Sequence, residues 1–212
     1  MLVKICGIKT KQAAQTAANA GADLIGFVFA PSKRRISPSD AAIIAKSLPA
    51  SSKTVGVFVN ESVERMMEIA NLVGLDYIQL HGDEPAAIAQ QLDYKIIKAF
   101  PVQQDNLSEI KAYPCDFYLL DSPAGVNRGG NGTTFDWHLT RNLSLDPAKI
   151  ILAGGLTVEN VNQASKLVNP AGVDVSSGVE VNGEKDLVKI KEFIESAKKS
   201  RKDETIENLH NA

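Results

Sequence analysis

The sequence of 212 residues contains only two cysteines, Cys6 and Cys115. Two cysteines are too few for a disulfide framework or for a zinc site built from cysteines, so we expect reduced thiols and a cytoplasmic location. No apolar run approaches the roughly 20 residues that span a bilayer, and Lys4 interrupts the apolar stretch at the N-terminus. We also find no export signal. These absences argue against a membrane protein and against a disulfide-stabilised secreted domain.

The chain also lacks an excess of positive charge. Its 23 Lys and Arg residues stand against 25 Asp and Glu residues, which gives a formal net charge of −2. A nucleic-acid-binding surface needs a basic surplus to neutralise phosphates, so this class of partner is not expected. Hydrophobic residues make up 44% of the chain and charged residues 23%, as is typical of a globular protein with its own core. Enzymes and small-ligand binders are the classes that remain.

Short apolar segments recur along the whole chain, each rich in Val, Ile, Leu or Phe and bounded by Gly, Pro, Asn or Asp. This pattern is typical of buried parallel strands. The predicted strands are Leu2–Cys6, Leu24–Phe29, Val55–Val59, Tyr77–Leu80, Ile96–Phe100, Phe117–Leu120, Ile150–Ala153 and Val173–Ser176. Amphipathic stretches between and after them predict helices over Lys11–Ala20, Ser39–Ser47, Ser62–Val73, Glu84–Leu92, Val158–Val168 and Asp186–Lys199.

Two α/β architectures accommodate this alternation, a (β/α)8 TIM barrel and an open, doubly wound sheet. The count of strands favours the barrel. An open sheet often carries a G-x-G-x-x-G turn after its first strand, whereas this chain has Cys6-Gly7-Ile8-Lys9-Thr10 there. No linker divides the chain. We therefore predict a single domain, a (β/α)8 barrel over residues 1–199, followed by a polar tail over residues 200–212 that is frayed or poorly packed.

In such a barrel the active site forms where the strands end and the loops begin. Cys6 and Asp121 end the predicted first and sixth strands. A cysteine in an apolar strand is usually a small buried hydrophobe, and we assign that role to Cys115, which starts its strand. A carboxylate that closes an apolar run is harder to explain by packing, so Asp121 is a functional candidate. His81 ends the fourth strand, where a lone histidine is more often structural.

Two glycine-containing loops follow the last two predicted strands, Gly154-Gly155 and Ser176-Ser177-Gly178. Many barrels hold a phosphate at this position with backbone N–H groups. Glycine permits the close approach of the backbone, and serine hydroxyls add further donors. Ordinary tight turns are the alternative interpretation, but two such loops on adjacent strands favour a phosphate site.

Side-chain parity along the strands adds a structural expectation. Lys4 and Cys6 share one face of the first strand, and Asp174 and Ser176 share one face of the eighth. The first and eighth strands are neighbours in a closed barrel, so Lys4 and Asp174 are predicted to pair in its interior, where either charge alone would be costly. The glycine-rich loop Ser122–Thr134 is long enough to be a lid or a binding loop, with a surface excursion as the alternative.

Taken together, these segments resemble the phosphoribosylanthranilate isomerase family of tryptophan biosynthesis. The stretches that carry the resemblance follow the family's order: VKICGI, GADLIGFVFAP, RRISP, VGVFVN, QLHGDE, IKA, LLD, GGNGTTFDW, LAGGLTVEN and GVDVSSGVE. They cover the chain from residue 2 to about residue 199, and the tail lies outside them. KICG, QLHGDE, the loop that ends in TFDW, and DVSSGVE are together highly specific.

The resemblance implies a (β/α)8 barrel and an Amadori rearrangement of N-(5-phosphoribosyl)anthranilate to 1-(2-carboxyphenylamino)-1-deoxyribulose 5-phosphate. On the family's pattern Cys6 is the general base and Asp121 the general acid. No metal or cofactor is expected, because the substrate nitrogen serves as the electron sink. We expect nearby positive charge or helix dipoles to hold Cys6 as a thiolate, and desolvation to keep Asp121 partly protonated.

The resemblance also implies the substrate contacts. Arg34 would engage the anthranilate carboxylate through its planar fork of donors. The phosphate would bind at Gly154, Gly155, Ser176, Ser177 and Gly178. His81 and Asp174 complete the expected substrate-binding set. The segment before Arg34 is one residue shorter than in many relatives, and Arg35 stands where an aromatic residue is common, which bears on how the anthranilate ring is held. The expected partner is a small phosphosugar, and the expected state is a monomer, with a homodimer as the alternative.

Other functions fit parts of the sequence. Histidine-pathway aminoaldose isomerases perform the same chemistry but have an aspartate where this chain has Cys6. A lyase like indole-glycerol-phosphate synthase would need catalytic lysines and a longer N-terminal extension. A non-catalytic barrel that binds a phosphorylated ligand would need neither Cys6 nor Asp121, so the presence of both favours an enzyme.

Overall fold

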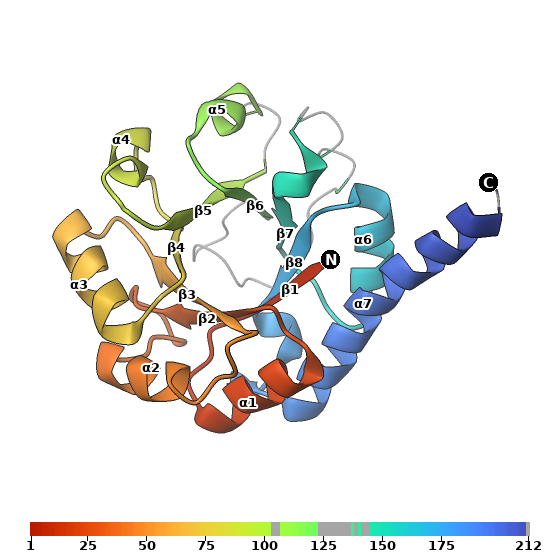
Figure 1. Ribbon diagram of the computed structural model, residues 1–212, viewed down its shortest axis with the longest axis horizontal. Coiled ribbons are helices and arrows are strands. Elements are labelled where there is room, and N and C mark those ends of the chain that lie inside the picture. The colour runs from red at the N-terminus through yellow and green to blue at the C-terminus, as the bar shows by residue number, and fades with distance from the viewer. Residues whose placement is uncertain (103–106, 123–136, 138–139, 141–144, 211–212) are drawn as a thin grey trace.

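The chain folds into a closed barrel of eight parallel strands in the order β1 to β8, with β1 paired to β8 (Figure 1). The computed structural model describes residues 1–102, 107–122, 137, 140 and 145–210. Helices form a ring around the strands. This confirms the predicted (β/α)8 barrel and excludes the open sheet, whose two edge strands would each lack a partner on one side.

The barrel strands are β1 (Leu2–Cys6), β2 (Leu24–Val28), β3 (Lys53–Phe58), β4 (Tyr77–Leu80), β5 (Lys95–Pro101), β6 (Phe117–Asp121), β7 (Ile150–Leu152) and β8 (Gly172–Val175). The helices are α1 (Lys11–Ala20), α2 (Pro38–Ala45), α3 (Val63–Val73), α4 (Ala86–Ala89), α5 (Leu107–Ala112), α6 (Val161–Val168) and α7 (Leu187–His210). A short hairpin of β9 (Glu180–Val181) and β10 (Glu184–Lys185) follows β8. Each predicted strand matches an observed one to within two residues at either end.

Local capping decides where the helices begin and end. The Thr10 side chain accepts a hydrogen bond from the N–H of Ala13 at the start of α1, and Gly21 ends this helix at a φ of 97°. The predicted start of α6 at Val158 is wrong. The Thr157 N–H donates to Asn160 Oδ1 at 2.8 Å, which holds these residues in a turn ahead of the helix.

The barrel interior is a packed core. One buried cluster consists of inward-facing side chains: Leu24, Val55, Ile97, Ala99, Leu119, Ile151 and Ala153. The outward faces of the strands pack against the helices in a second, larger cluster. Because side chains alternate along a strand, the inward row that contains Leu119 on β6 continues to Asp121 at the strand end. The same alternation on β1 aligns Lys4 with Cys6.

A buried ion pair joins the first strand to the last. Lys4 Nζ lies 3.0 Å from Asp174 Oδ1, and Lys4 is fully buried. The two residues are register partners in the β1–β8 ladder. Burial lowers the pKa of the Lys4 ammonium, but Asp174 and Cys6 outweigh that effect and leave this pKa raised. The pairing predicted from strand parity is therefore confirmed, and Lys4 is charged at neutral pH.

We expect Lys4→Met to lower the free energy of unfolding by about 3 kcal/mol, because the substitution leaves Asp174 as an unpaired charge at the edge of the core. Urea unfolding followed by circular dichroism measures the loss. The double variant Lys4→Met/Asp174→Val removes both charges and should recover most of the lost stability. Equal losses in the single and double variants would contradict this account of the pair.

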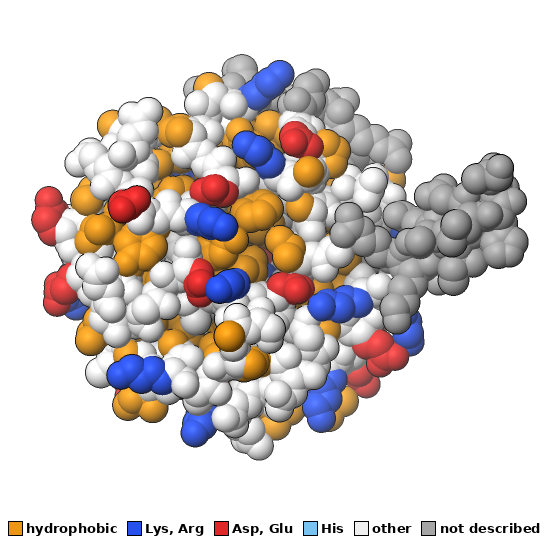
Figure 2. All heavy atoms as spheres, in the orientation of Figure 1, with side chains coloured by type: hydrophobic (Ala, Val, Ile, Leu, Met, Phe, Trp, Pro, Cys, Tyr) orange, Lys and Arg blue, Asp and Glu red, His pale blue; other side chains and the backbone are white. Residues whose placement is uncertain are grey.

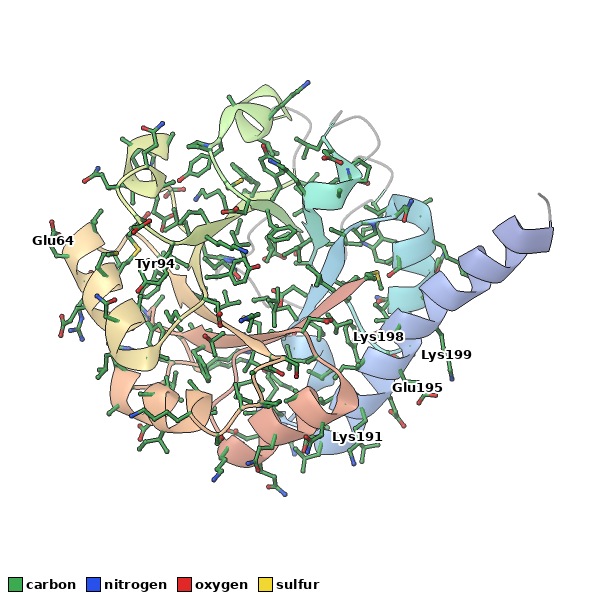
Figure 3. The ribbon with its side chains drawn as sticks, viewed as in Figure 1. Glu64, Tyr94, Lys191, Glu195, Lys198 and Lys199 are labelled. Carbon is green, nitrogen blue, oxygen red and sulfur yellow. The ribbon has the colours of Figure 1, made fainter. Side chains whose placement is uncertain are left out.

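The last helix, α7, packs against α1 and α6. Its backbone continues beyond the barrel to His210 (Figure 1). Lys191, Glu195 and Lys199 follow one another at intervals of four residues along α7 (Figure 3), and the Lys199 ammonium pairs with the Glu195 carboxylate at 2.7 Å. The predicted division between a barrel over 1–199 and a tail over 200–212 falls within this helix and stays a prediction.

The described surface mixes charges of both signs. On the face shown in Figure 2, acidic and basic side chains are interspersed around a centre richer in hydrophobic side chains, in keeping with a net charge of −2. No helix among the described residues is long and apolar enough to cross a membrane.

Candidate active site

A cavity of about 640 Å³ opens among the carboxyl ends of the strands. All residues of the predicted site but Gly178 line this cavity. They are Cys6, Arg34, His81, Asp121, Gly154, Gly155, Asp174, Ser176 and Ser177. Gly178, the exception, packs against the backbone of Leu156 next to this lining. A second hollow of about 670 Å³ lies between α1 and α7 and is lined by helix residues alone. Only the first cavity brings the predicted residues together.

Cys6 reaches the cavity from the end of β1 and is only 8% exposed. Burial raises the pKa of its thiol, and the ammonium of Lys4, which hydrogen-bonds the sulfur, opposes this only in part. The predicted lowering of this pKa is therefore wrong in direction, because enclosure of the strand end outweighs the neighbouring cation. At neutral pH the protonated thiol is the favoured form of Cys6.

Asp121 reaches the same cavity from the end of β6 and has a histidine as its neighbour. Its Oδ1 accepts a hydrogen bond from the Ser122 N–H at 2.8 Å, and its Oδ2 lies 3.5 Å from His81 Nε2. On the other side of the ring, Gln79 Nε2 lies 2.8 Å from His81 Nδ1. If the amide donates there, the neutral ring carries its proton on Nε2, toward Asp121. Gln79 was not predicted from the sequence, although it lies two residues before His81 and so shares its face of the chain at the end of β4.

A buried ion pair holds the loop that carries His81. Lys98 Nζ lies 2.8 Å from Glu84 Oε2 and donates to the Gly82 carbonyl at 2.7 Å. Glu84 Oε1 accepts a hydrogen bond from the Asn60 N–H at 2.7 Å. These contacts join the loops after β3 and β4, so His81 is placed by a network centred on a buried ion pair.

The loops after β7 and β8 form one wall of the cavity. Gly154 and Gly155 adopt φ values of 79° and 62°, which residues with side chains rarely adopt. A Cβ atom on Gly178 would overlap the carbonyl oxygen of Leu156. Glycine is therefore required at these positions for the backbone turns and for the contact between the two loops.

Arg34 reaches the cavity from the loop after β2 and is held by a residue that the sequence analysis left unassigned. Its Nε and Nη2 donate to Glu180 Oε1 and Oε2 at 2.7 and 3.0 Å. Lys185 Nζ lies 2.6 Å from Glu180 Oε1 and donates to the Ser176 carbonyl at 2.9 Å. Glu180 closes the DVSSGVE motif, which was the available signal.

The two cations keep the Glu180 carboxyl ionised. Burial opposes ionisation of the Glu180 carboxyl, but the hydrogen bonds from Arg34 and Lys185 outweigh it and lower the pKa of this group. Burial lowers the pKa of the Lys185 ammonium, and Glu180 opposes that shift. The result is one carboxylate bound by two cations at the edge of the cavity.

Part of the predicted site lies outside the described residues. The glycine-rich loop Ser122–Thr134 belongs to this part from residue 123 onward. Among the residues that are described, no group of three or more His, Cys, Asp or Glu side chains could hold a metal ion.

Active sites of (β/α)8-barrel enzymes lie at the carboxyl ends of the strands, where Cys6 and Asp121 line one cavity in this chain, and the chain is an enzyme of this class. A family model described as N-(5'phosphoribosyl)anthranilate (PRA) isomerase matches residues 3–196. The chain belongs to this family.

Individual relatives agree with the family model. An N-(5'-phosphoribosyl)anthranilate isomerase of Oceanobacillus iheyensis is 50% identical over 195 residues, which are 92% of this chain and 95% of the relative. A solved phosphoribosyl anthranilate isomerase in complex with reduced 1-(o-carboxyphenylamino)-1-deoxyribulose 5-phosphate is 40% identical, with a TM-score of 0.80 over 94% of this chain and 100% of that chain. A structure of monomers generated from the dimeric isomerase of Thermotoga maritima is also 40% identical, with a TM-score of 0.83 and the same coverage. The resemblance inferred from the motifs is thus confirmed.

Proposed function

We propose that this chain catalyses the Amadori rearrangement of N-(5-phospho-β-D-ribosyl)anthranilate to 1-(2-carboxyphenylamino)-1-deoxy-D-ribulose 5-phosphate in tryptophan biosynthesis. One observation carries the proposal beyond family membership. Cys6 on β1 and Asp121 on β6 line the same cavity, although their strands are not neighbours in the barrel. An acid and a base can therefore act on one sugar from different sides.

The rearrangement requires proton transfers at neighbouring positions of the sugar. Asp121 gives a proton to the furanose oxygen, the C1–O bond breaks, and the nitrogen lone pair forms a C1=N iminium. The Cys6 thiolate then removes the proton from C2, and the C–H electron pair becomes a C1=C2 bond while the iminium π pair returns to nitrogen. Loss of the C2 hydroxyl proton and protonation of C1 complete the ketose. No electrons leave the substrate, so the proposed reaction needs no redox cofactor or metal.

The remaining residues are proposed to bind the substrate. Arg34 would bind the anthranilate carboxylate, and His81 would contact the substrate beside Asp121. Asp174 has one carboxylate oxygen on Lys4 and lines the cavity, so we propose that it contacts the sugar. The phosphate would bind at the wall formed by Gly154, Gly155, Ser176, Ser177 and Gly178. The loop that includes Phe135 would cover the substrate and limit hydrolysis of the iminium.

We further propose that the partner of this chain is a small phosphosugar, that no nucleic acid binds, and that the protein is a cytoplasmic monomer. The net charge of −2 supports the absence of a nucleic-acid partner. A homodimer is the alternative, because the related isomerase of Thermotoga maritima is described as dimeric.

A coupled assay tests the activity. Anthranilate, phosphoribosyl pyrophosphate and a transferase generate the labile substrate, and loss of anthranilate-type fluorescence is followed after this protein is added. Fast loss supports the proposal. No turnover by folded protein would overturn it and would direct the search to other sugar phosphates, to a histidine-pathway aminoaldose, or to binding without catalysis.

We expect Gly178→Ala to raise the KM of the phosphosugar at least about tenfold, because the new Cβ meets a backbone oxygen and forces the two phosphate loops apart. Steady-state kinetics in the coupled assay measures the change. Gly74→Ala, at the end of α3, is the control: the added Cβ meets nothing within 4 Å, although φ is 74°. This control should lose stability but keep its KM. An unchanged KM in Gly178→Ala would place the phosphate elsewhere.

A further inference from the structure

We propose that Glu180 is the positioning residue that presents Arg34 to the substrate carboxylate, so that the enzyme selects arylamine substrates with a carboxylate ortho to the nitrogen. This inference rests on the proposed function. Glu180 takes no part in the proton transfers described above, and its role is to orient another side chain.

The Arg34 guanidinium has two edges, and each of them can bind a carboxylate. A guanidinium can hold a carboxylate through Nε and one terminal nitrogen, or through its two terminal nitrogens. Glu180 occupies the first edge through Nε and Nη2. Nη1 has no hydrogen-bond partner among the described residues, while Arg34 lines the cavity and Glu180 does not. The edge formed by Nη1 and Nη2 is therefore the one left for a second carboxylate.

The ion pair between Arg34 and Glu180 is buried, and it is connected to the cavity wall that is proposed to bind the phosphate. The side chains of Arg34 and Glu180 are 9% and 6% exposed. Lys185 links Glu180 to Ser176, which lines the cavity on the phosphate side. The chain of contacts from Arg34 through Glu180 and Lys185 to Ser176 thus fixes the spacing between the groups proposed to bind the two anionic ends of the substrate.

Charge and geometry make opposite predictions for Glu180. If this carboxylate only neutralised Arg34, its removal would strengthen the binding of an anionic ligand. If it orients Arg34, its removal would weaken that binding, because the guanidinium would lose the two hydrogen bonds that fix its direction. The sign of the change therefore distinguishes the two roles.

A pair of stable ligands tests the inference. Reductive amination of ribose 5-phosphate with anthranilate or with aniline gives two 1-arylamino-1-deoxyribitol 5-phosphates that differ only in the carboxylate. We expect the wild-type protein to bind the carboxylated ligand at least about tenfold more tightly by calorimetry, as a charge-assisted bidentate contact should allow. In Glu180→Gln this preference should fall to about threefold or less, while affinity for the aniline ligand changes by less than about twofold.

The control variant is Glu184→Gln in the same hairpin. Glu184 pairs with Lys9 at 2.9 Å and does not line the cavity, so the preference should stay at its wild-type value. The double variant Glu180→Gln/Lys185→Met also removes the positive charge of Lys185, so no unpaired cation repels Arg34. It does not restore the bidentate ion pair between Arg34 and Glu180. Its preference should remain low, and it provides a folded test if the single variant does not fold.

Each other outcome overturns the inference. An equal loss for both ligands in Glu180→Gln would assign Glu180 a structural role. A stronger preference for the carboxylated ligand would assign it a neutralising role. An unchanged preference, recovery in the double variant, or no preference in the wild-type protein would remove the positioning role. If the wild-type protein shows the preference but does not turn over the substrate, the proposed activity fails while the positioning role stands.

Discussion

Cys6→Ala should lower kcat/KM at least about 100-fold, because it removes the group proposed to take the C2 proton, and general bases contribute roughly 10²–10⁴-fold. The coupled fluorescence assay measures the loss. Cys115→Ala is the matched control. Burial raises the pKa of the Cys115 thiol to about 12, and this residue does not line the cavity. Its removal should leave kcat/KM unchanged. Activity that survives in Cys6→Ala would exclude Cys6 as the base.

The pH dependence of the same reaction tests the state of Cys6. The thiolate is the active form, and burial raises the pKa of this thiol. The kcat/KM of the wild-type protein should therefore rise with pH through neutrality, with its midpoint above the ordinary thiol value of about 8.5. In Cys6→Asp the base is a carboxylate, which ordinarily titrates near ~3.9. The rise of kcat/KM with pH should therefore move to acidic pH in this variant. A wild-type profile that is flat above neutral pH would contradict the assignment.

The fold could be predicted from sequence because a parallel barrel follows a simple period. Each strand is a short apolar run, and alternation of side chains determines which residues face inward. That alternation was sufficient to pair Lys4 with Asp174, which the structure confirms at 3.0 Å. It was also sufficient to place Cys6 and Asp121 at the mouth of one barrel.

The sign of the Cys6 pKa shift could not be predicted in the same way. A neighbouring lysine on the same strand face is visible in the sequence, and it lowers the pKa as expected. The opposing effect is desolvation, which depends on how completely other strands and loops enclose the sulfur. Side-chain parity identifies which residues neighbour Cys6, but it does not show how completely they enclose its sulfur.

The ion pair between Arg34 and Glu180 could not be predicted from the sequence for a related reason. Arg34 and Glu180 are 146 positions apart in the chain, and only closure of the barrel brings them together. The hairpin that carries Glu180 did have a local signal. Asn182 and Gly183, between β9 and β10, adopt φ values of 53° and 83°, as an Asn-Gly hairpin turn requires. Recognising this turn would have indicated that the chain doubles back beside the site.

Asp121→Asn should lower kcat/KM at least about 100-fold, because the amide has nearly the shape of the carboxyl but cannot give up a proton. The loss should appear in kcat rather than in KM, since the amide oxygen can still accept the hydrogen bond that the Ser122 N–H donates to Asp121. Asp116→Asn is the control. Asp116 Oδ2 accepts a hydrogen bond from the Ile96 N–H at 2.7 Å, just before β6 begins, and an asparagine retains that acceptor.

An isotope effect separates the proposed acid from the proposed base. Substrate carrying deuterium at C2 slows only the step in which Cys6 removes that proton. If Asp121 opens the ring, Asp121→Asn makes ring opening rate-limiting, and the isotope effect should fall toward one. Cys6→Ser weakens the base, so removal of the C2 proton becomes the slow step and this variant should instead show the largest isotope effect. A large effect in Asp121→Asn would mean that proton removal from C2 has become the slow step. Asp121 would then act on the same step as Cys6, and another group would have to open the ring.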